Sequence, residues 1–289
     1  MKDFPLPVRL VGAGSQPVED EDLQYLAMPR EMTTFRMPLV PEKAPVHALA
    51  EARDTISALL AAMEGWDPDA EPHGPRVDLS GMGGETLEII NQVLGEGEVS
   101  VRIDGARPHV IQESVFTGVW RVVAPDAGDA AAGDWLEAAK MPRVVAEAAR
   151  AGAAARLADV AVPAGAMNSP ALLTEIAAQI HERRADGTAH VINLTLFPMS
   201  PEDHQVLESA LPVGPVAIMS RGFGNCRITS TGARDVWRVQ YFNNMNTLIL
   251  NTIEVVGMPE VALAAAEDLD DTRTRLAELI EWMSESCAQ

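Results

Sequence analysis

The sequence offers two thiols, Cys226 and Cys287, and Cys226 follows an unusual glycine-rich segment. Gly222 and Gly224 flank Phe223, and two glycines around an aromatic residue favour a close backbone approach or a positive φ angle. A thiol in this position has three interpretations: a soft metal ligand, a functional thiol that contacts a partner, or a buried structural cysteine. The residue types alone leave the three open.

The motifs that would assign catalysis or metal binding are missing. The six histidines show no ligand spacing, so a metal site at Cys226 would need further ligands that the sequence pattern does not supply. The sequence has no Gly-x-Ser-x-Gly, His-Glu-x-x-His or Cys-x-x-Cys motif. We therefore predict no catalytic residue, no cofactor-binding residue and no metal ligand, and we expect a protein that is not an enzyme.

A second candidate group consists of acidic residues. Glu96 and Glu98 lie where the predicted second helix joins the sheet, and together with Asp104 they would suit a metal ion or a basic partner. The alternative is that they are ordinary solvated charges at the end of a strand. The sequence around them does not decide between the two.

A third candidate group lies in the N-terminal segment, where methionine and phenylalanine alternate with prolines. Prolines remove backbone donors and favour extended or turn conformations, so residues 1–45 are predicted to form an extended arm. The arm either packs on the core of its own chain or contacts a partner. The side chains that would make the contact are Met28, Met32, Phe35 and Met37.

The elements that would position these residues occur twice in the chain. The sequence Trp-Arg-Val at residues 120–122 begins again at 237, and the offset, 237 − 120 = 117, aligns the two halves without a gap. We interpret this pattern as a tandem duplication. A residue present in only one copy is then a better candidate for function than a shared one. Glu96 and Glu98 meet this criterion, since their counterparts are Val213 and Pro215.

Hydrophobic periodicity predicts the same order of elements in each copy. Each copy is an α-β-α-β-β-β(-β)-α unit, which gives an α+β fold with mixed, largely antiparallel sheets and a pseudo-twofold relation between the copies. The ranges expected in the first copy are 48–63, 76–79, 84–94, 98–103, 109–115 and 119–124. Those expected in the second copy are 169–180, 190–196, 201–211, 216–220, 225–230, 236–242 and 248–256. Residues 125–134 are predicted to be a flexible loop in place of a fourth strand.

The predicted organisation has four parts. Residues 1–45 form the arm, residues 46–150 the first α+β repeat, residues 163–267 the second repeat, and residues 268–289 a C-terminal acidic helix. The apolar face expected for this last helix consists of Leu269, Leu276, Leu279, Ile280 and Met283. Whether the two repeats form one sheet or two is left open.

Composition narrows the classes of partner. The 289 residues carry a formal net charge of −20, which repels nucleic-acid phosphate and anionic lipid and attracts basic peptides. No run approaches the roughly 20 apolar residues of a membrane span, and the N-terminus does not resemble a signal peptide. We therefore expect a cytoplasmic protein with reduced thiols that binds neither nucleic acid nor membrane.

Several segments together carry a family resemblance, namely residues 28–32, 94–99, 222–228, 240–243 and 248–255. Over essentially its whole length the chain resembles the HupH/HyaF/HoxQ family of hydrogenase expression/formation proteins. Phe223 departs from the tyrosine expected there, which argues against a catalytic tyrosine at this position.

The resemblance implies a non-enzymatic chaperone in the maturation of uptake nickel–iron (NiFe) hydrogenase. Its implied client is the precursor of the iron–sulfur small subunit, held before twin-arginine export and assembly with the large subunit. A thioredoxin-like companion chaperone is a further implied partner, and a homodimer is left open. The residues expected to contact the client are Glu96, Glu98, Phe223, Asn225 and Cys226, together with the arm. Two alternatives remain: a redox or iron–sulfur handling factor that uses Cys226, and a small-molecule-binding regulator.

Overall fold

The computed structural model describes residues 44–287 except 72, 126–131, 183–187 and 223. All of the described residues belong to one compact unit of the chain, residues 35–289. The predicted arm contacts Met28, Met32, Phe35 and Met37 lie outside the described residues. These four positions therefore stay predictions.

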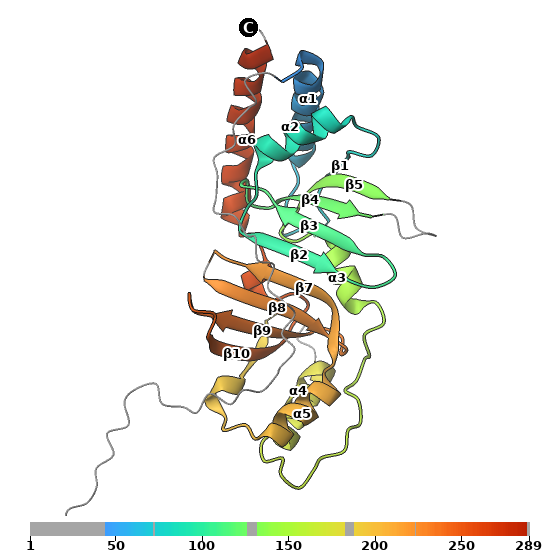
Figure 1. Ribbon diagram of the computed structural model, residues 1–289, viewed down its shortest axis with the longest axis vertical. Helices are drawn as coiled ribbons and strands as arrows, with labels where there is room; N and C mark the ends of the chain where they lie inside the picture. The colour runs from blue at the N-terminus through green and yellow to red at the C-terminus, as the bar shows by residue number, and fades with distance from the viewer. Residues whose placement is uncertain (1–43, 72, 126–131, 183–187, 223, 288–289) are drawn as a thin grey trace, which may run out of the picture. The chain divides into compact units, whose positions relative to one another are not determined.

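One ten-stranded sheet runs through both halves of the sequence (Figure 1). The first half supplies β1 (Arg76–Asp78), β2 (Val99–Ile103), β3 (His109–Glu113), β4 (Val119–Ala124) and β5 (Gly133–Ala138). The second half supplies β6 (His190–Asn193), β7 (Val213–Ser220), β8 (Asn225–Thr231), β9 (Val236–Phe242) and β10 (Leu248–Val255). The order is β1-β5-β4-β3-β2-β7-β8-β9-β10-β6, so β2 and β7 join the halves and each half repeats the same order outward from this junction.

The expectation of mixed sheets was wrong. Every neighbouring pair among these ten strands is antiparallel, including the pair β2 and β7 that joins the two halves. Antiparallel strands need only short connections, and the loops between β2, β3 and β4 and between β7, β8 and β9 are short. The α+β class itself is confirmed.

Within the part of the chain that the structure describes, six α-helices flank the sheet. They are α1 (Val46–Met63), α2 (Gly84–Leu94), α3 (Arg143–Arg150), α4 (Ser169–Glu182), α5 (Pro201–Ala210) and α6 (Ala266–Cys287). Two short 3₁₀ helices, η1 (Leu194–Leu196) and η2 (Glu260–Ala262), complete the described elements. The helices are distributed over three hydrophobic clusters, each of which also contains strand residues.

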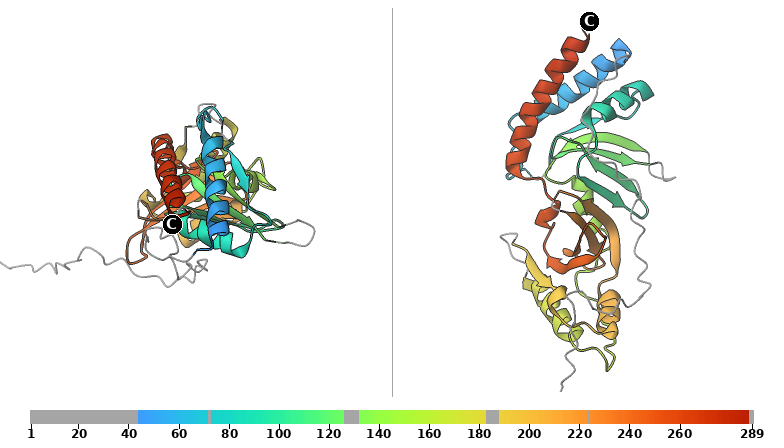
Figure 2. Two further views of the ribbon diagram at one scale, coloured as in Figure 1. Left: turned by 90° about the horizontal axis from the view of Figure 1, so that it is seen from above. Right: turned by 60° about the vertical axis from the view of Figure 1, so that its left-hand side comes forward.

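The C-terminal helix α6 follows the second half in sequence but packs on the first half. Leu269, Leu276 and Met283 are fully buried in the cluster that contains α1 and α2, and both views show α6 beside α1 (Figure 1 and Figure 2). The apolar stripe of α6 is therefore buried against the helix layer of the first half.

The middle cluster lies under the junction of the two halves. Alternate residues of β2, β4, β7, β8 and β9 point to one face, where α3 and η2 cover them. Trp120 and Trp237, the two tryptophans of the repeated Trp-Arg-Val sequence, are both buried here. The third cluster joins α4 and α5 to β6 and β10.

Two local expectations were wrong. Residues 125–134 were expected to be a loop, but β5 begins at Gly133 and pairs with β4 as far as Ala138, with Leu136 fully buried. The alanine and glycine content before Gly133 hides the short apolar run that follows it. Residues 190–196 were expected to be one strand, but η1 begins at Leu194 because the Asn193 side chain accepts a hydrogen bond from the Thr195 N–H.

Candidate interaction surface at one edge of the sheet

The antiparallel order brings candidate residues from both halves to one edge of the sheet. Val99 at the start of β2 lies opposite Ser220 at the end of β7, and Asn225 at the start of β8 lies opposite Phe242 at the end of β9. The connections before β2, between β7 and β8, and between β9 and β10 therefore meet at the same edge. We call this edge the strand-end rim and define it as the described residues 96–98, 221, 222, 224, 225 and 243–249.

The acidic part of the rim joins the two halves. Arg221 donates its backbone N–H to the carbonyl oxygen of Glu98 at 3.1 Å, and a Cβ atom added to Gly222 would collide with the Glu98 carboxylate. Glu96 and Glu98 are both exposed. Burial lowers the pKa of Arg221, and the nearby charge of Glu96 opposes that shift. The structure therefore brings the predicted acidic pair against the predicted glycine-rich segment.

The guanidinium of Arg221 is incompletely satisfied. Its Nη2 atom is buried and has no hydrogen-bond partner within the described part of the chain. A buried charged donor without a partner is costly, and a ligand that offers an acceptor would relieve that cost. The neighbouring residue Phe223 is outside the described residues.

A buried carboxyl group lies behind the exposed acids. Glu113 is only 5% exposed, and its Oε1 atom accepts a hydrogen bond from the Gly118 N–H at 3.0 Å. Burial raises the pKa of Glu113 to about 7, and the charges of Glu98 and Asp268 raise it further against the backbone hydrogen bonds. The total negative charge at this part of the rim therefore changes near neutral pH.

The two glycines of the segment have the two roles that the sequence suggested. Gly224 has φ = +98°, which L-residues with a side chain rarely adopt, and Gly222 leaves room for Glu98. Asn225, which follows, is half-buried at the start of β8. The segment therefore approaches Glu98 closely.

Cys226 does not belong to this exposed surface, and its assignment as a client contact is corrected. Its side chain is 1% exposed and lies in the middle cluster on the face covered by α3. Burial raises the pKa of the Cys226 thiol to about 12, although a hydrogen bond with Tyr241 partly opposes the shift. A partner cannot reach this sulfur in the folded chain, and the thiolate that redox chemistry needs is strongly disfavoured.

The sequence reasoning missed the apolar part of the rim. Asn243 Oδ1 accepts hydrogen bonds from the backbone N–H groups of Met245 and Thr247, both at 2.9 Å, and Asn246 has φ = +60°. This tight turn between β9 and β10 holds Met245 outward, and its side chain is 83% exposed. An adaptable apolar side chain at the tip of a fixed turn is suited to contact a partner.

Further exposed apolar side chains lie on the elements next to this turn. The register of β9 and β10 shifts between Leu248 and Leu250, and Ile249 remains exposed at this irregularity. The Thr195 side chain accepts the Asn251 N–H at 2.9 Å, which ties η1 to the start of β10. The exposed apolar residues of this region, which we call the apolar patch, are Met245, Leu248 and Ile249 of the rim together with Leu196 and Phe197 beside it.

A signal for the apolar patch was present in the repeat. Position 245 corresponds to Gly128 (245 − 117 = 128), and positions 248 and 249 correspond to Ala131 and Ala132. The large apolar side chains therefore occur in one copy only, like Glu96 and Glu98. Both the acids and this hairpin differ between the two copies, but only the acids were predicted as a site on that ground.

No metal centre is assembled within the described residues. They contain no group of three or more His, Cys, Asp and Glu side chains that could hold a metal ion. No helix among them is both long enough and apolar enough to cross a membrane.

Comparisons with known proteins identify the family. The family model described as HupH hydrogenase expression protein, C-terminal conserved region, matches twice, at residues 49–162 and 166–283. The hydrogenase expression/formation protein HoxQ of Cupriavidus necator is 46% identical, covering 98% of this chain and 99% of that protein. HupH of Rhodobacter capsulatus is 40% identical (97% and 98% covered), and the hydrogenase-1 operon protein HyaF of Escherichia coli K12 is 33% identical (96% of each).

Among solved structures, the hydrogenase expression protein HupH from Thiobacillus denitrificans matches 38% of this chain and 92% of its own, with 28% identity and a TM-score of 0.36. The family model covers most of the sequence, and the relatives named above align over nearly their full length. The chain therefore belongs to the HupH family of hydrogenase expression/formation proteins.

Proposed function

We propose that this protein is a non-enzymatic chaperone of NiFe hydrogenase maturation that binds the precursor of the iron–sulfur small subunit in the cytoplasm, before twin-arginine export. The names of its relatives, hydrogenase expression/formation proteins, support the maturation role. The client is inferred from the family resemblance and from the character of the strand-end rim.

The observation that carries the proposal is the order of charge and hydrophobicity along the rim. The acidic part lies at β2 and β7 and the apolar patch at β10, four strand spacings from β2, or roughly 19 Å. An export signal peptide has a positively charged segment followed by an apolar segment of about 7–15 residues. An extended chain covers the rim with about six residues, so both parts of such a peptide could bind together.

The two parts of the rim would contribute differently. Glu96 and Glu98 are exposed, so they would attract and orient a basic segment more than they would increase its affinity. The apolar patch would supply most of the binding free energy by burying its side chains against the client. Met245 adapts to different apolar partners because its side chain is unbranched and flexible.

The burial of Cys226 counts against the alternative of a redox or iron–sulfur handling factor. A thiol with a pKa of about 12 and 1% exposure is a poor nucleophile and a poor ligand for a transferred cluster. The thioredoxin-like companion, the homodimer and the origin of the two halves by duplication remain proposals. The double match of the family model supports the last of these.

Co-purification tests the client directly. Tagged protein would be isolated from hydrogenase-expressing cells that produce the small subunit either as full-length precursor or without its signal peptide. Capture of the full-length form alone is the expected result, because the rim would bind the signal peptide. Capture of both forms would move recognition to the folded body, and capture of neither would contradict the proposed client.

A further inference from the structure

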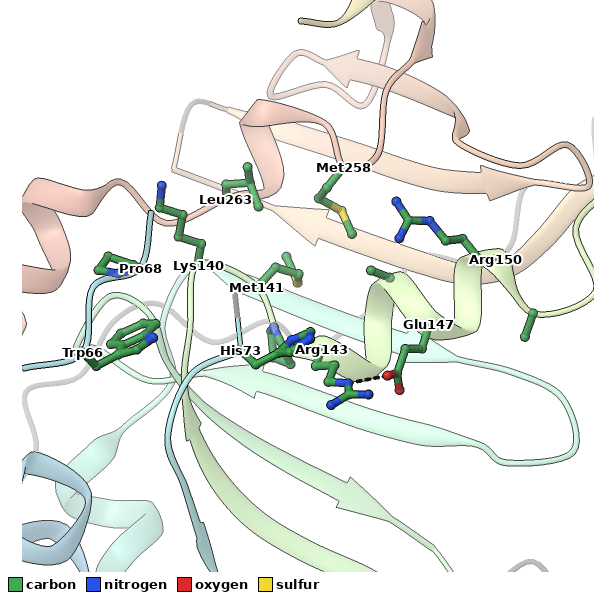
Figure 3. Close-up of a pocket in the computed structure, with 13 residues that line it drawn as sticks. Trp66, Pro68, His73, Lys140, Met141, Arg143, Glu147, Arg150, Met258 and Leu263 are labelled. Carbon is green, nitrogen blue, oxygen red and sulfur yellow. Dashed lines mark hydrogen bonds and ion pairs between the residues drawn. The ribbon is translucent and has the colours of Figure 1, made fainter. Parts of the chain in front are cut away.

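A pocket of about 680 Å³ opens next to α3, on the side of the sheet that Cys226 faces (Figure 3). This volume lies within the range of about 300–1,000 Å³ that is typical of ligand sites. Met141 and Met258 both line it, and they are equivalent positions of the two halves, since 258 − 141 = 117. We call this cavity the seam pocket. Trp66, Pro68 and Leu263 add further apolar surface.

The charged lining of the seam pocket is mainly basic, in contrast to a chain of net charge −20. Lys140, Arg143 and Arg150 line it together with His73, and Glu147 is the only acidic residue of the lining. Figure 3 shows the methionines and Leu263 between Lys140 on one side and Arg150 on the other. A ligand in this pocket therefore meets an apolar centre with cations at both ends.

The repeat indicates that the fold does not require these cations. The counterparts of Lys140 and Arg143 are Gly257 (140 + 117) and Glu260 (143 + 117). The counterpart of Arg150 is Glu267 (150 + 117). Equivalent structural positions in the second half thus carry no charge or the opposite charge. The methionine and proline that precede α3, in contrast, recur in both halves.

The cations are paired, but the pairs leave donors for a ligand. Arg143 pairs with Glu147, Lys140 pairs with Asp69, and Arg150 Nε donates to Asp235 Oδ1 at 2.8 Å. Within the described residues the Nη atoms of Arg150 make no hydrogen bond. The Lys140–Asp69 and Arg143–Glu147 pairs are partly exposed and contribute little to stability, so exchanging or sharing a partner with a ligand carboxylate costs little there. An arginine with free terminal nitrogens can bind a carboxylate through two parallel bonds.

A simple phosphate site fits this pocket less well. The N-terminus of α3, where an anion would bind, already meets a carboxylate, because Glu137 Oε1 accepts the Arg143 N–H at 3.0 Å. Glu137 is fully buried and also pairs with Arg76. A phosphate would face this negative charge, whereas an apolar side chain between Met141 and Met258 would not.

We propose that the seam pocket binds a short acidic peptide segment of a partner protein, with carboxylates at Lys140 and Arg150 and an apolar side chain between Met141 and Met258. This proposal does not depend on the client proposed for the rim. It rests on the residues of the seam pocket, whose charged side chains are mainly basic, whereas those of the rim are acidic. A partner bound here would not compete for the basic segment that the rim is proposed to bind.

A binding titration with synthetic peptides tests the proposal. The probe is a fluorescent hexapeptide of alternating aspartate and leucine, and a lysine–leucine hexapeptide serves as the charge control. The acidic peptide is expected to bind, and Arg150→Glu or Lys140→Glu should weaken binding at least about tenfold through the loss of a charge-assisted contact. Arg102→Glu changes an exposed arginine of β2 outside the pocket and should leave binding unchanged.

A further variant and a competitor distinguish the possible outcomes of this titration. Arg150→Gln removes the charge but keeps a side-chain amide that can donate to Asp235, so it should also weaken binding. Thermal unfolding of the same variant distinguishes a loss of binding from a loss of folding. Failure of the parent protein to bind the acidic peptide would overturn the proposal. So would equal binding by the pocket variants, equal binding of the basic peptide, or displacement of the peptide by millimolar inorganic phosphate.

Discussion

Val101 on β2 and Ile218 on β7 lie directly opposite each other, and they are equivalent residues of the two halves, since 218 − 101 = 117. The neighbouring pairs are related in the same way. Val99 lies opposite Ser220 and Ile103 lies opposite Val216, and each of these pairs maps onto the other by the same offset. The pairing thus places a pseudo-twofold relation at the junction of the two halves. Surfaces whose residues differ between the two halves are the candidates for function.

The exposed acids of the rim differ in this way, because they occur in the first half only. Replacing Glu96 and Glu98 together with lysine should slow association with a client that carries a basic segment roughly tenfold at low salt, because it reverses the local field. Association rates measured by surface plasmon resonance at low and high salt would check this. Asp104→Lys, at an exposed acid of the opposite end of β2, is the control for Glu96→Lys and Glu98→Lys made singly, since each of these variants changes the net charge by the same two units. An equal decrease of the association rate in the control would show that the effect comes from the net charge alone.

The buried carboxyl of Glu113 should make stability depend on pH. Its pKa is about 7 in the folded chain and 4.5 ordinarily, so between these values the unfolded state releases a proton that the folded state keeps. Stability is therefore expected to fall as pH rises from 4.5 to 7, by about 3 kcal/mol for this group. Urea unfolding of the parent and of Glu113→Gln at pH 5 and pH 8 measures it. Parallel pH profiles would show that Glu113 does not titrate in this range.

The thiol of Cys226 should be unreactive in the folded protein. A rise in pKa from 9.0 to about 12 reduces the thiolate fraction about a thousandfold, and burial adds a steric barrier. In a Cys287→Ala background, reaction with Ellman's reagent should be slow in the native state and fast in urea. Rapid labelling of the native protein would reopen the interpretation of Cys226 as a functional thiol.

The buried carboxylate of Asp203 should be important for the stability of the second half. Its Oδ1 atom accepts backbone N–H bonds from Met167, Asn168 and Ser169, and its Oδ2 atom accepts one from Ser200, so one side chain organises the starts of α4 and α5. Burial alone would raise the pKa of Asp203, but these donors outweigh it and hold the pKa below its ordinary value.

Asp203→Asn is expected to cost about 2–4 kcal/mol, since hydrogen bonds to a charged acceptor are the stronger ones. The contribution of the carboxylate is present above the unfolded pKa of 3.8 and is lost as pH falls toward the folded value. Denaturant unfolding at pH 7 measures the cost, with the exposed residue Asp54 changed to asparagine as control. A cost equal to that of the control would refute the capping role.

Hydrophobic periodicity correctly predicted the helices and strands in which the pattern is strong. The ranges 84–94, 119–124 and 236–242 were predicted at their observed bounds as α2, β4 and β9. Helix α2 has apolar residues at helical spacing, and the two strands alternate around a buried tryptophan. Element β5 was missed because its apolar run is short and follows a segment rich in alanine and glycine.

Relations between distant segments could not be read from periodicity. Nothing local indicates that β2 pairs with β7, or that α6 returns to α1, because each choice depends on which apolar faces remain uncovered after the halves fold. The seam pocket was missed for the same reason, since Trp66, Lys140 and Met258 are far apart in sequence. The acidic pair was predicted because the two copies differ there, and the same comparison would have found Met245.

The most direct test of the proposed client surface is site-specific photocrosslinking from the strand-end rim. A photoreactive phenylalanine analogue at position 245 should crosslink to the small-subunit precursor, because Met245 is held outward at the tip of the β9–β10 turn. The same analogue at the exposed Val110, on β3 away from the rim, should give no product. A crosslink from position 110 but not from position 245 would contradict the assignment of the rim as the client-binding surface.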